Sequence, residues 1–275
     1  GAGAGADSTY GKSIANLGDF NGDGVVDIAV GMPGPHLSST VKGEVNIHYM
    51  NANGSVKSTV KINENTTNGP DVHSYGNYGN SLENIGDLDG DGVNDLAVGE
   101  LNHNSHSGEG AVHIHFLNSN GSIKSTQKID PSNLTDDKTA SHGIYVFFGS
   151  SITNIGDHNR DGVIDIAVGS NEGYYWEDGS YRGEMHRGSI YVLYMKTDGT
   201  VKDSVRIDND YLNAPDIGHG PRQWYGSFGS SIVATDIDGD LMLDLVVGSP
   251  TDRTAGYSGT SARAEGSMFV ITLHN

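Results

Sequence analysis

Four short segments of the sequence carry the side chains best suited to chemistry, because each gathers acidic or amide oxygens within nine residues. Each has Asp, Asp or Asn, Asp and Asp at its positions 1, 3, 5 and 9, and the segments begin at residues 19, 87, 157 and 236. Oxygen ligands at this spacing can surround one cation, and they suit Ca²⁺ better than Mg²⁺, which demands a stricter octahedron. The backbone carbonyl of position 7 is expected to add a ligand. The sequence therefore predicts up to four calcium sites, formed by Asp19, Asn21, Asp23, Val25 and Asp27; Asp87, Asp89, Asp91, Val93 and Asp95; Asp157, Asn159, Asp161, Val163 and Asp165; and Asp236, Asp238, Asp240, Met242 and Asp244.

An EF-hand and a plain solvated turn both fit these segments less well. An EF-hand needs flanking helices and a bidentate Glu at position 12, but that position is Val in every copy (Val30, Val98, Val168 and Val247). A solvated acidic turn is common singly, yet these four segments carry 14 aspartates, which repel one another unless a cation intervenes. Leu241 stands at position 6, where the other copies have Gly for a sharp bend, so the fourth site is expected to be distorted or weaker.

The acidic segments belong to a repeat with a period of about 70 residues. In each copy an aromatic-Gly pair precedes a short strand-like run, and an apolar run follows the acidic loop. A third run alternates apolar and polar residues, as a strand with one buried face does. An Asn-Gly or Asp-Gly turn then leads, in three copies, to a fourth run rich in Lys, Ser and Thr, which suits an outer strand. The aromatic-Gly pairs are Tyr10-Gly11, Tyr78-Gly79, Phe148-Gly149 and Phe228-Gly229.

This pattern predicts an all-β fold, a β-propeller of four blades that are each a four-stranded antiparallel meander. One domain is expected over residues 1–275, with blades over 10–62, 78–129, 148–207 and 228–273. The fourth copy stops where its turn would begin, so the last blade lacks its outer strand. Residues 1–9 are able to complete that blade, or to pair with a neighbouring copy by strand addition and so link copies head to tail into a fibre. A closed ring of four blades is favoured over part of a larger ring.

Composition excludes several classes of function. The 275 residues include 16 Lys and Arg and have a net charge of −19, which argues against a nucleic-acid partner. No apolar run is long enough to span a membrane. Cysteine is absent, which excludes disulfides and thiol catalysis. No catalytic triad or acid–base pair can be identified, so the chain is predicted not to be an enzyme. His113 and His115 are expected on an exposed strand face, although a metal site shared with His103 and His106 stays an alternative.

The repeat resembles the FG-GAP repeat, the blade of integrin α-subunit propellers. The aromatic-Gly pairs stand for its Phe-Gly, Gly31-Met32-Pro33 and Gly248-Ser249-Pro250 stand for its Gly-Ala-Pro, and the acidic loop matches its calcium loop. The Pro is missing after Gly99 and Gly169, and integrin propellers have seven blades rather than four. The resemblance implies calcium loops on one face and a partner-binding face opposite, formed by the longer connections between strands.

The longer connections carry the residues expected to contact a ligand, since exposed aromatic side chains suit protein or sugar partners. These are Tyr174, Tyr175, Trp176, Tyr181, Trp224 and Tyr225. Sequons for glycosylation occur at Asn53, Asn65, Asn120 and Asn133. The interpretation is a non-catalytic, calcium-stabilised scaffold for adhesion or assembly, secreted or at the cell surface, where millimolar calcium suits weak sites. A lectin-like module that binds carbohydrate or protein through the aromatic loops is the alternative.

Overall fold

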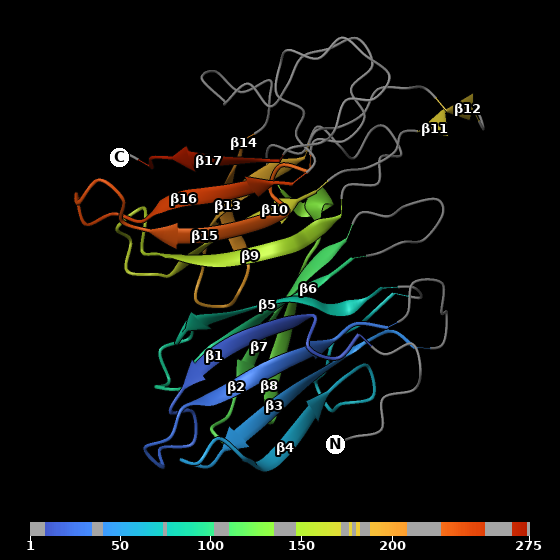
Figure 1. Ribbon diagram of the computed structural model, residues 1–275, viewed down its shortest axis with the longest axis vertical. Coiled ribbons are helices and arrows are strands. Elements are labelled where there is room, and N and C mark those ends of the chain that lie inside the picture. Colours follow the sequence, from blue (N-terminus) through green and yellow to red (C-terminus); the bar gives the residue numbers. More distant parts are fainter. Residues whose placement is uncertain are drawn as a thin grey trace.

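The computed structural model covers the 275-residue chain and describes residues 9–34, 41–73, 76–101, 110–134, 147–171, 176–177, 180–181, 188–207, 227–250 and 266–273. The described residues form an all-β structure of successive antiparallel sheets (Figure 1). One short 3₁₀ helix, η1 (Pro131–Asn133), follows the second sheet. Within the described ranges no helix is long and apolar enough to cross a membrane.

Each sheet is a meander whose strands pair in chain order, as the repeat predicts. The first blade has β1 (Ser13–Gly18), β2 (Asp27–Met32), β3 (Glu44–Met50) and β4 (Val56–Ile62). The second has β5 (Tyr78–Gly86), β6 (Asp95–Glu100), β7 (Ala111–Leu117) and β8 (Ile123–Ile129). The third has β9 (Phe148–Gly156), β10 (Asp165–Ser170), β13 (Ser189–Met195) and β14 (Val201–Ile207), and the fourth has β15 (Ser231–Thr235), β16 (Asp244–Ser249) and β17 (Ser267–Ile271).

The predicted fold class is confirmed, and the described part of the last blade has three strands, as expected. The division into a single domain stays a prediction. The completion of the last blade by residues 1–9 also stays a prediction, because residues 1–8 lie outside the described part of the chain. A two-stranded ribbon, β11 (Trp176–Glu177) with β12 (Ser180–Tyr181), lies in a connection that was expected to be a plain loop.

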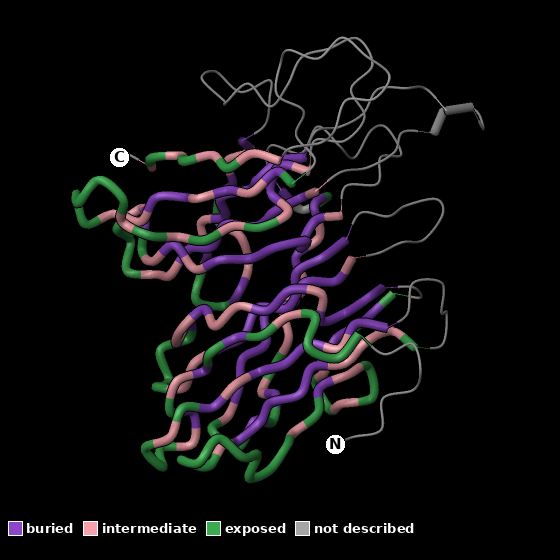
Figure 2. Tube along the Cα trace, in the orientation of Figure 1, coloured by how far each residue is buried: buried purple, intermediate pink, exposed green. Residues whose placement is uncertain are grey.

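The blades pack on one another in the order of the chain. The main contacts join the first strand of each blade to the first two strands of the blade before it. Three apolar clusters lie at the three seams: one joins the first and second blades, one the second and third, and one the third and fourth. The first and fourth blades lie at opposite ends of this run (Figure 1), and buried residues concentrate in the middle blades (Figure 2). The described strands therefore do not close the expected ring of four.

A close backbone approach marks each seam. A Cβ atom on Gly99 would come closer than 3.0 Å to the carbonyl oxygen of Gly149 in the next blade, so only glycine permits the contact. The same carbonyl accepts a hydrogen bond of 2.7 Å from the Ser81 hydroxyl. The aromatic side chain beside this glycine, Phe148, is fully buried. Gly31 and Gly169 occupy the same position at the other two seams. The aromatic-Gly pair of one blade is thus the element that fastens it to the blade before it.

Candidate metal centres

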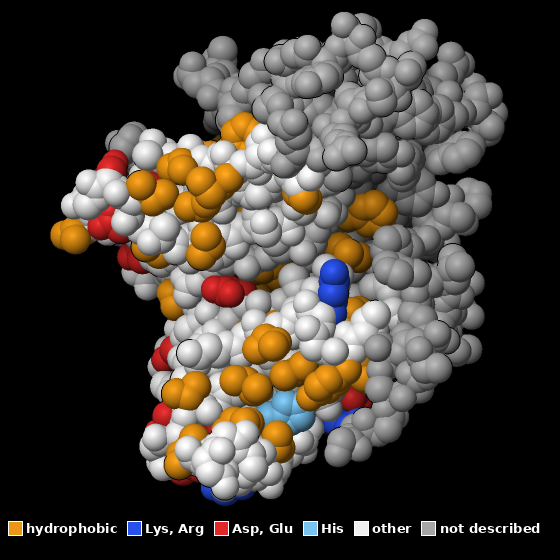
Figure 3. All heavy atoms as spheres, viewed as in Figure 1, with side chains coloured by type: hydrophobic (Ala, Val, Ile, Leu, Met, Phe, Trp, Pro, Cys, Tyr) orange, Lys and Arg blue, Asp and Glu red, His pale blue; other side chains and the backbone are white. Residues whose placement is uncertain are grey.

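The four acidic loops lie at the same junction in every blade, between its first and second strands. Position 9 of each loop is the first residue of the second strand, at Asp27, Asp95, Asp165 and Asp244. The loops project along one edge of the run of blades, on the left in Figure 1, and Figure 3 shows acidic side chains along that edge. The structure therefore places the predicted ligand segments on one face of the protein.

The aspartate at position 1 holds the loop in a tight turn by accepting hydrogen bonds from the backbone of the same loop. In the second blade, Asp87 Oδ1 accepts hydrogen bonds from the backbone N–H groups of Gly90 (2.8 Å) and Asp91 (2.9 Å), and Oδ2 accepts one from Gly92 (2.8 Å). The position-6 N–H makes the same bond to Asp19, Asp157 and Asp236 in the other loops. Because side-chain acceptors satisfy these N–H groups, the turn holds its shape without backbone partners for them.

The aspartate at position 9 is buried and ties the loop to the third strand. Asp95 Oδ1 accepts the N–H of Leu117 (3.1 Å), and Oδ2 accepts the N–H of Leu88 (3.0 Å). Burial raises the pKa of Asp95 to about 6, even though both hydrogen bonds favour the ionised form. A cation beside this carboxylate would reverse that shift, since a nearby positive charge stabilises the ionised group.

Two of the loops bring three carboxylates together closely enough to share a metal ion. One oxygen from each of Asp87, Asp89 and Asp95 lies within 4.8 Å of the others, and Asp236, Asp238 and Asp244 form the same arrangement. Two ligands of one Ca²⁺ lie at most about 5 Å apart, because each binds at 2.3–2.6 Å. The residues present thus fit a calcium ion. In the first and third loops position 3 is an amide, Asn21 or Asn159, which also offers an oxygen.

Sequence reasoning missed a lysine that reaches each of the first three loops from the outer strand. Lys57 Nζ lies 2.8 Å from Asp23, and Lys202 Nζ lies 2.8 Å from Asp161. Lys124 Nζ lies 2.9 Å from Asp89 and also contacts Asp91. Hydrogen bonds from these lysines lower the pKa of the position-5 carboxyl groups, which holds them ionised. The signal was present, because Lys is the second residue of all three outer strands.

The fourth loop keeps its shape despite the substitution at position 6. Leu241 has φ +72°, close to the values of +84°, +89° and +87° at the glycines of the other loops, and its side chain is 91% exposed. Its N–H still binds Asp236 Oδ2 at 3.1 Å. The expected distortion is therefore absent from the described backbone, and the cost appears instead as a left-handed conformation in a side-chain-bearing residue. Whether the site is weaker stays a prediction.

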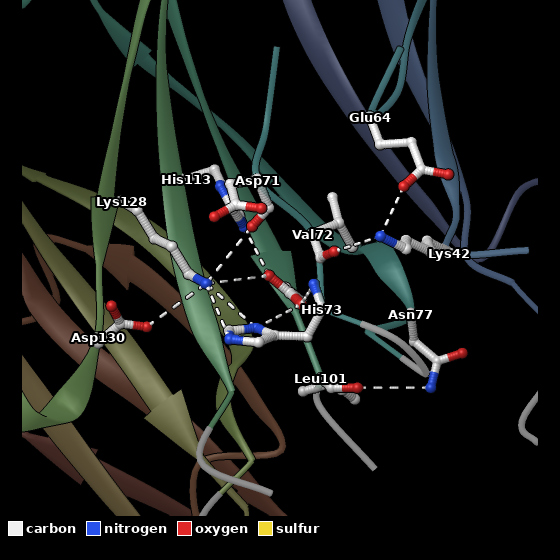
Figure 4. Close-up of polar contacts among 11 residues, drawn as sticks. Lys42, Glu64, Asp71, Val72, His73, Asn77, Leu101, His113, Lys128 and Asp130 are labelled. Atoms are coloured by element: carbon white, nitrogen blue, oxygen red, sulfur yellow. Dashed lines mark hydrogen bonds and ion pairs between the residues drawn. The ribbon is translucent and has the colours of Figure 1, made fainter. Parts of the chain in front are cut away.

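A separate polar cluster lies at the opposite end of the second blade, around the buried carboxylate of Glu100. His113 Nε2 lies 2.7 Å from Glu100 Oε2 and His73 Nδ1 lies 3.0 Å from Oε1, while Lys128 Nζ is 3.9 Å away (Figure 4). Burial by itself would raise the pKa of Glu100, but the hydrogen bonds from both histidines and the lysine charge hold it at about 2. The cluster fastens the connection that carries His73 to the end of β6.

The expectation that His113 and His115 lie on an exposed face is wrong. Both are fully buried, because the face that carries them packs against the first blade. His115 Nδ1 pairs with Thr126 Oγ1 at 2.8 Å, and its Nε2 pairs with the Tyr78 hydroxyl at 2.6 Å. His103 and His106 lie outside the described residues.

The remaining predicted positions are placed only in part. Trp176 lies opposite Tyr181 in the ribbon of β11 and β12, but nothing is described of their side chains. Tyr174, Tyr175, Trp224 and Tyr225 lie outside the described residues. The sequon residues Asn53, Asn65 and Asn120 are exposed, and Asn133 ends η1. The roles of these ten residues in binding or glycosylation stay predictions.

The fold and its recurrent acidic loops define a propeller protein built from one repeated blade. Residues 79–115 match the family model FG-GAP repeat. Integrin alpha-11 of Homo sapiens is 35% identical over 167 residues, which cover 59% of this chain and 12% of that protein. Integrin alpha-V of Gallus gallus is 30% identical over 243 residues, which cover 88% of this chain and 20% of that protein.

A third relative has a different name. Phosphatidylinositol-glycan-specific phospholipase D of Rattus norvegicus is 33% identical over 174 residues, which cover 60% of this chain and 17% of that protein. The chain spans a fifth or less of the length of these three relatives. Residues 79–115 match an FG-GAP repeat, and the chain is FG-GAP-like and integrin-alpha-like over most of its length.

Proposed function

We propose that this chain is a non-catalytic, extracellular adhesion propeller whose acidic loops bind calcium as structural ions. The observation that carries the proposal is the convergence of three carboxylates in one loop, with one oxygen each from Asp87, Asp89 and Asp95 within 4.8 Å of the others. Similarity to integrin alpha subunits supports the adhesion role and a location outside the cell or on its surface. The similarity to a phospholipase D covers 60% of this chain, whereas the similarity to integrin alpha-V covers 88%.

The loops would hold calcium through side chains at four positions. Position 1 shapes the turn and position 9 anchors it to the third strand, and both lie close to the carboxylate of position 3. Position 5 would add a further oxygen. The bound ion would offset the repulsion among the clustered carboxylates and lower the pKa of Asp95, which burial raises to about 6. Lysines such as Lys124 occupy the same carboxylates, so an ion and the lysine would compete for them.

The size of the expected stabilisation follows from linkage. At about 1 mM calcium and a Kd of about 0.1 mM, each site adds about 1.4 kcal/mol to the free energy of unfolding. Four such sites together add about 6 kcal/mol, which corresponds to a rise of about 10–20 °C in Tm for a chain of this size. Binding of this strength suits millimolar external calcium and not cytosolic levels.

The test is thermal unfolding in calcium and in excess chelator, on the wild type and a matched pair of variants. Asp87→Asn removes one predicted ligand, and Asp71→Asn removes an exposed acid that lies outside the loops. We expect chelation to lower Tm reversibly, and Asp87→Asn to lose part of the calcium-dependent gain while Asp71→Asn keeps all of it. An unchanged Tm on chelation would overturn the calcium part of the proposal.

A further inference from the structure

Consecutive blades bury the faces that they turn to each other. One face of the first blade and one face of the fourth blade have no such neighbour and are exposed. We call the face that a blade turns to the following blade its forward face, and the one it turns to the preceding blade its rear face. The forward face of the fourth blade carries Val233, Val246, Met268 and Val270. The rear face of the first blade carries Ile14 and His48, and the Tyr10 hydroxyl contacts His48 there. Apolar side chains gather over the fourth blade in Figure 3.

On the forward face, equivalent positions are buried in the other blades. Met268 and Val270 are 70% and 48% exposed. The strand pairing places Met268 opposite Gly248 as it places Val45 opposite Gly31, so Val45 and Ile47 are the equivalents in the first blade. Both of these are 0% exposed, as are Val112 and Ile114 in the second blade. The three internal seams thus show what covers such a face, namely the rear face of another blade.

The rear face of the first blade is exposed in the same way. Ile14 is 64% exposed, whereas its equivalents Leu82 and Ile152 are 6% and 5% exposed because each packs on the blade before it. Tyr10 is 49% exposed, and its equivalent Tyr78 is fully buried. Burial of these apolar groups would contribute stability roughly in proportion to the area removed from water.

The hydrogen bond that joins neighbouring blades has a matching donor in the fourth blade and a matching acceptor in the first. At each internal seam a serine hydroxyl donates to the glycine carbonyl of the next blade's aromatic-Gly pair at 2.7 Å. Ser231 holds the donor position in the fourth blade and has no such acceptor among the described residues. Gly11 holds the acceptor position in the first blade, with φ +85° against +90°, +89° and +85° at the other three glycines. A Cβ atom on Gly248 would contact only Ser231 of its own blade. At the equivalent glycines of the other blades, a Cβ atom would also collide with a backbone carbonyl of the following blade.

We propose that the forward face of the fourth blade binds the rear face of the first blade of a second copy of this chain. The two faces lie at opposite ends of the run of blades, so the described strands of one copy do not bring them together (Figure 1). The rear face of the first blade repeats that of the second, with Tyr10, Ile14 and His48 at the places of Tyr78, Leu82 and His115. Within the chain, the rear face of the second blade packs on the forward face of the first blade.

The contact differs from strand addition, because it joins the faces of two sheets and not their edges. Ser231 of one copy would donate to the Gly11 carbonyl of the other, and Gly248 would admit that carbonyl. Two copies joined at both ends would make a ring of eight blades, which lies within the range of known propellers. The proposal does not rest on calcium binding or on the adhesion role.

The test is the mass of the protein in solution at tens of micromolar, by sedimentation and light scattering, where an interface of ordinary size associates. Met268→Asp/Val270→Asp spoils the forward face and Ile14→Asp spoils the rear face. Both sets of side chains are exposed, so circular dichroism should stay that of the wild type. Ser125→Asp is the control, since it adds a charge at an exposed position of β8 in the second blade.

We expect the wild type and the control to have twice the 29.0 kDa mass of one chain. Each face variant should be a single chain, and a mixture of the two should again give a one-to-one dimer through the unspoiled pair of faces. A folded wild type that remains a single chain would overturn the proposal, as would dimers that both variants retain. Running the series in calcium and in chelator separates this result from the calcium proposal, which is read from Tm.

Discussion

The seam glycines allow a sharp test of how one blade is fastened to the next, because the chain contains an internal control. Gly99 and Gly248 are equivalent, and a Cβ on either would press on the serine hydroxyl of its own blade. Only at Gly99 does the Cβ also meet the carbonyl of the next blade, at Gly149. Neither glycine has a positive φ, so alanine suits the backbone at both positions.

The magnitude follows from the contacts that each substitution disturbs. Gly99→Ala forces two backbones apart, for which overpacking costs about 1–3 kcal/mol. It also loses the 2.7 Å hydrogen bond of Ser81, worth about 1 kcal/mol. The lower chain entropy of alanine in the unfolded state returns about 0.5–1 kcal/mol. The net loss is about 1–3.5 kcal/mol for Gly99→Ala, whereas Gly248→Ala should stay within about 0.5 kcal/mol of the wild type.

The assay is thermal unfolding by circular dichroism, at a concentration low enough for single chains. For a protein of this size the difference corresponds to about 2–14 °C in Tm between the two variants. Equal shifts in Tm for Gly99→Ala and Gly248→Ala would refute the reasoning, because the approach of the next blade would then not be what excludes the Cβ atom.

Three further predictions concern the Glu100 cluster and the fourth loop. Glu100→Gln should lower the free energy of unfolding by about 2–4 kcal/mol near pH 6, because it breaks a buried charged network. The difference in free energy between variant and wild type should shrink as the pH falls from about 4.5 toward 2, since the wild-type carboxylate loses its stabilising charge across that range. A hydrogen bond to Glu100 raises the pKa of His73, so the stability that His73 adds is complete below pH 6.5 and is lost as the pH rises through the raised value; His73→Gln should lack this decline in urea titrations across that range. Leu241→Gly should raise the free energy of unfolding by up to about 1 kcal/mol, because it relieves a left-handed conformation at an exposed position, and a lower value would contradict the assigned strain.

Much of the fold could be read from the repeat, because each element carries a local signature. The aromatic-Gly pair, the acidic loop and the Asn-Gly turn mark the ends of strands, so the meander and its missing last strand follow from spacing alone. The positions of the acidic side chains in the loops followed in the same way, since ligand spacing is local in sequence.

The features that sequence reasoning missed depend on contacts between distant segments. His113 alternates with apolar residues, which favours an exposed face in a two-layer sheet; in a blade both faces are covered, and the polar side chain is buried beside Glu100. To predict that Lys124 lies beside Asp89, one must know the register between the third and fourth strands, which the sequence of a single strand does not show. The separation of the first and fourth blades among the described strands depends on the curvature of the whole run, which no single repeat encodes.

The order in which the blades pack has a consequence for how the molecule comes apart. Among the described strands, each blade makes its main contacts with its neighbours in sequence. This part of the structure therefore behaves as a short one-dimensional stack in which the inner units are held on two sides and the end units on one. The described part of the fourth blade is held by fewer contacts, since it has three strands where the other blades have four. Opening therefore begins at this end and runs inward seam by seam, and whatever covers the bare face of the fourth blade acts as the cap that sets the lifetime of the whole stack.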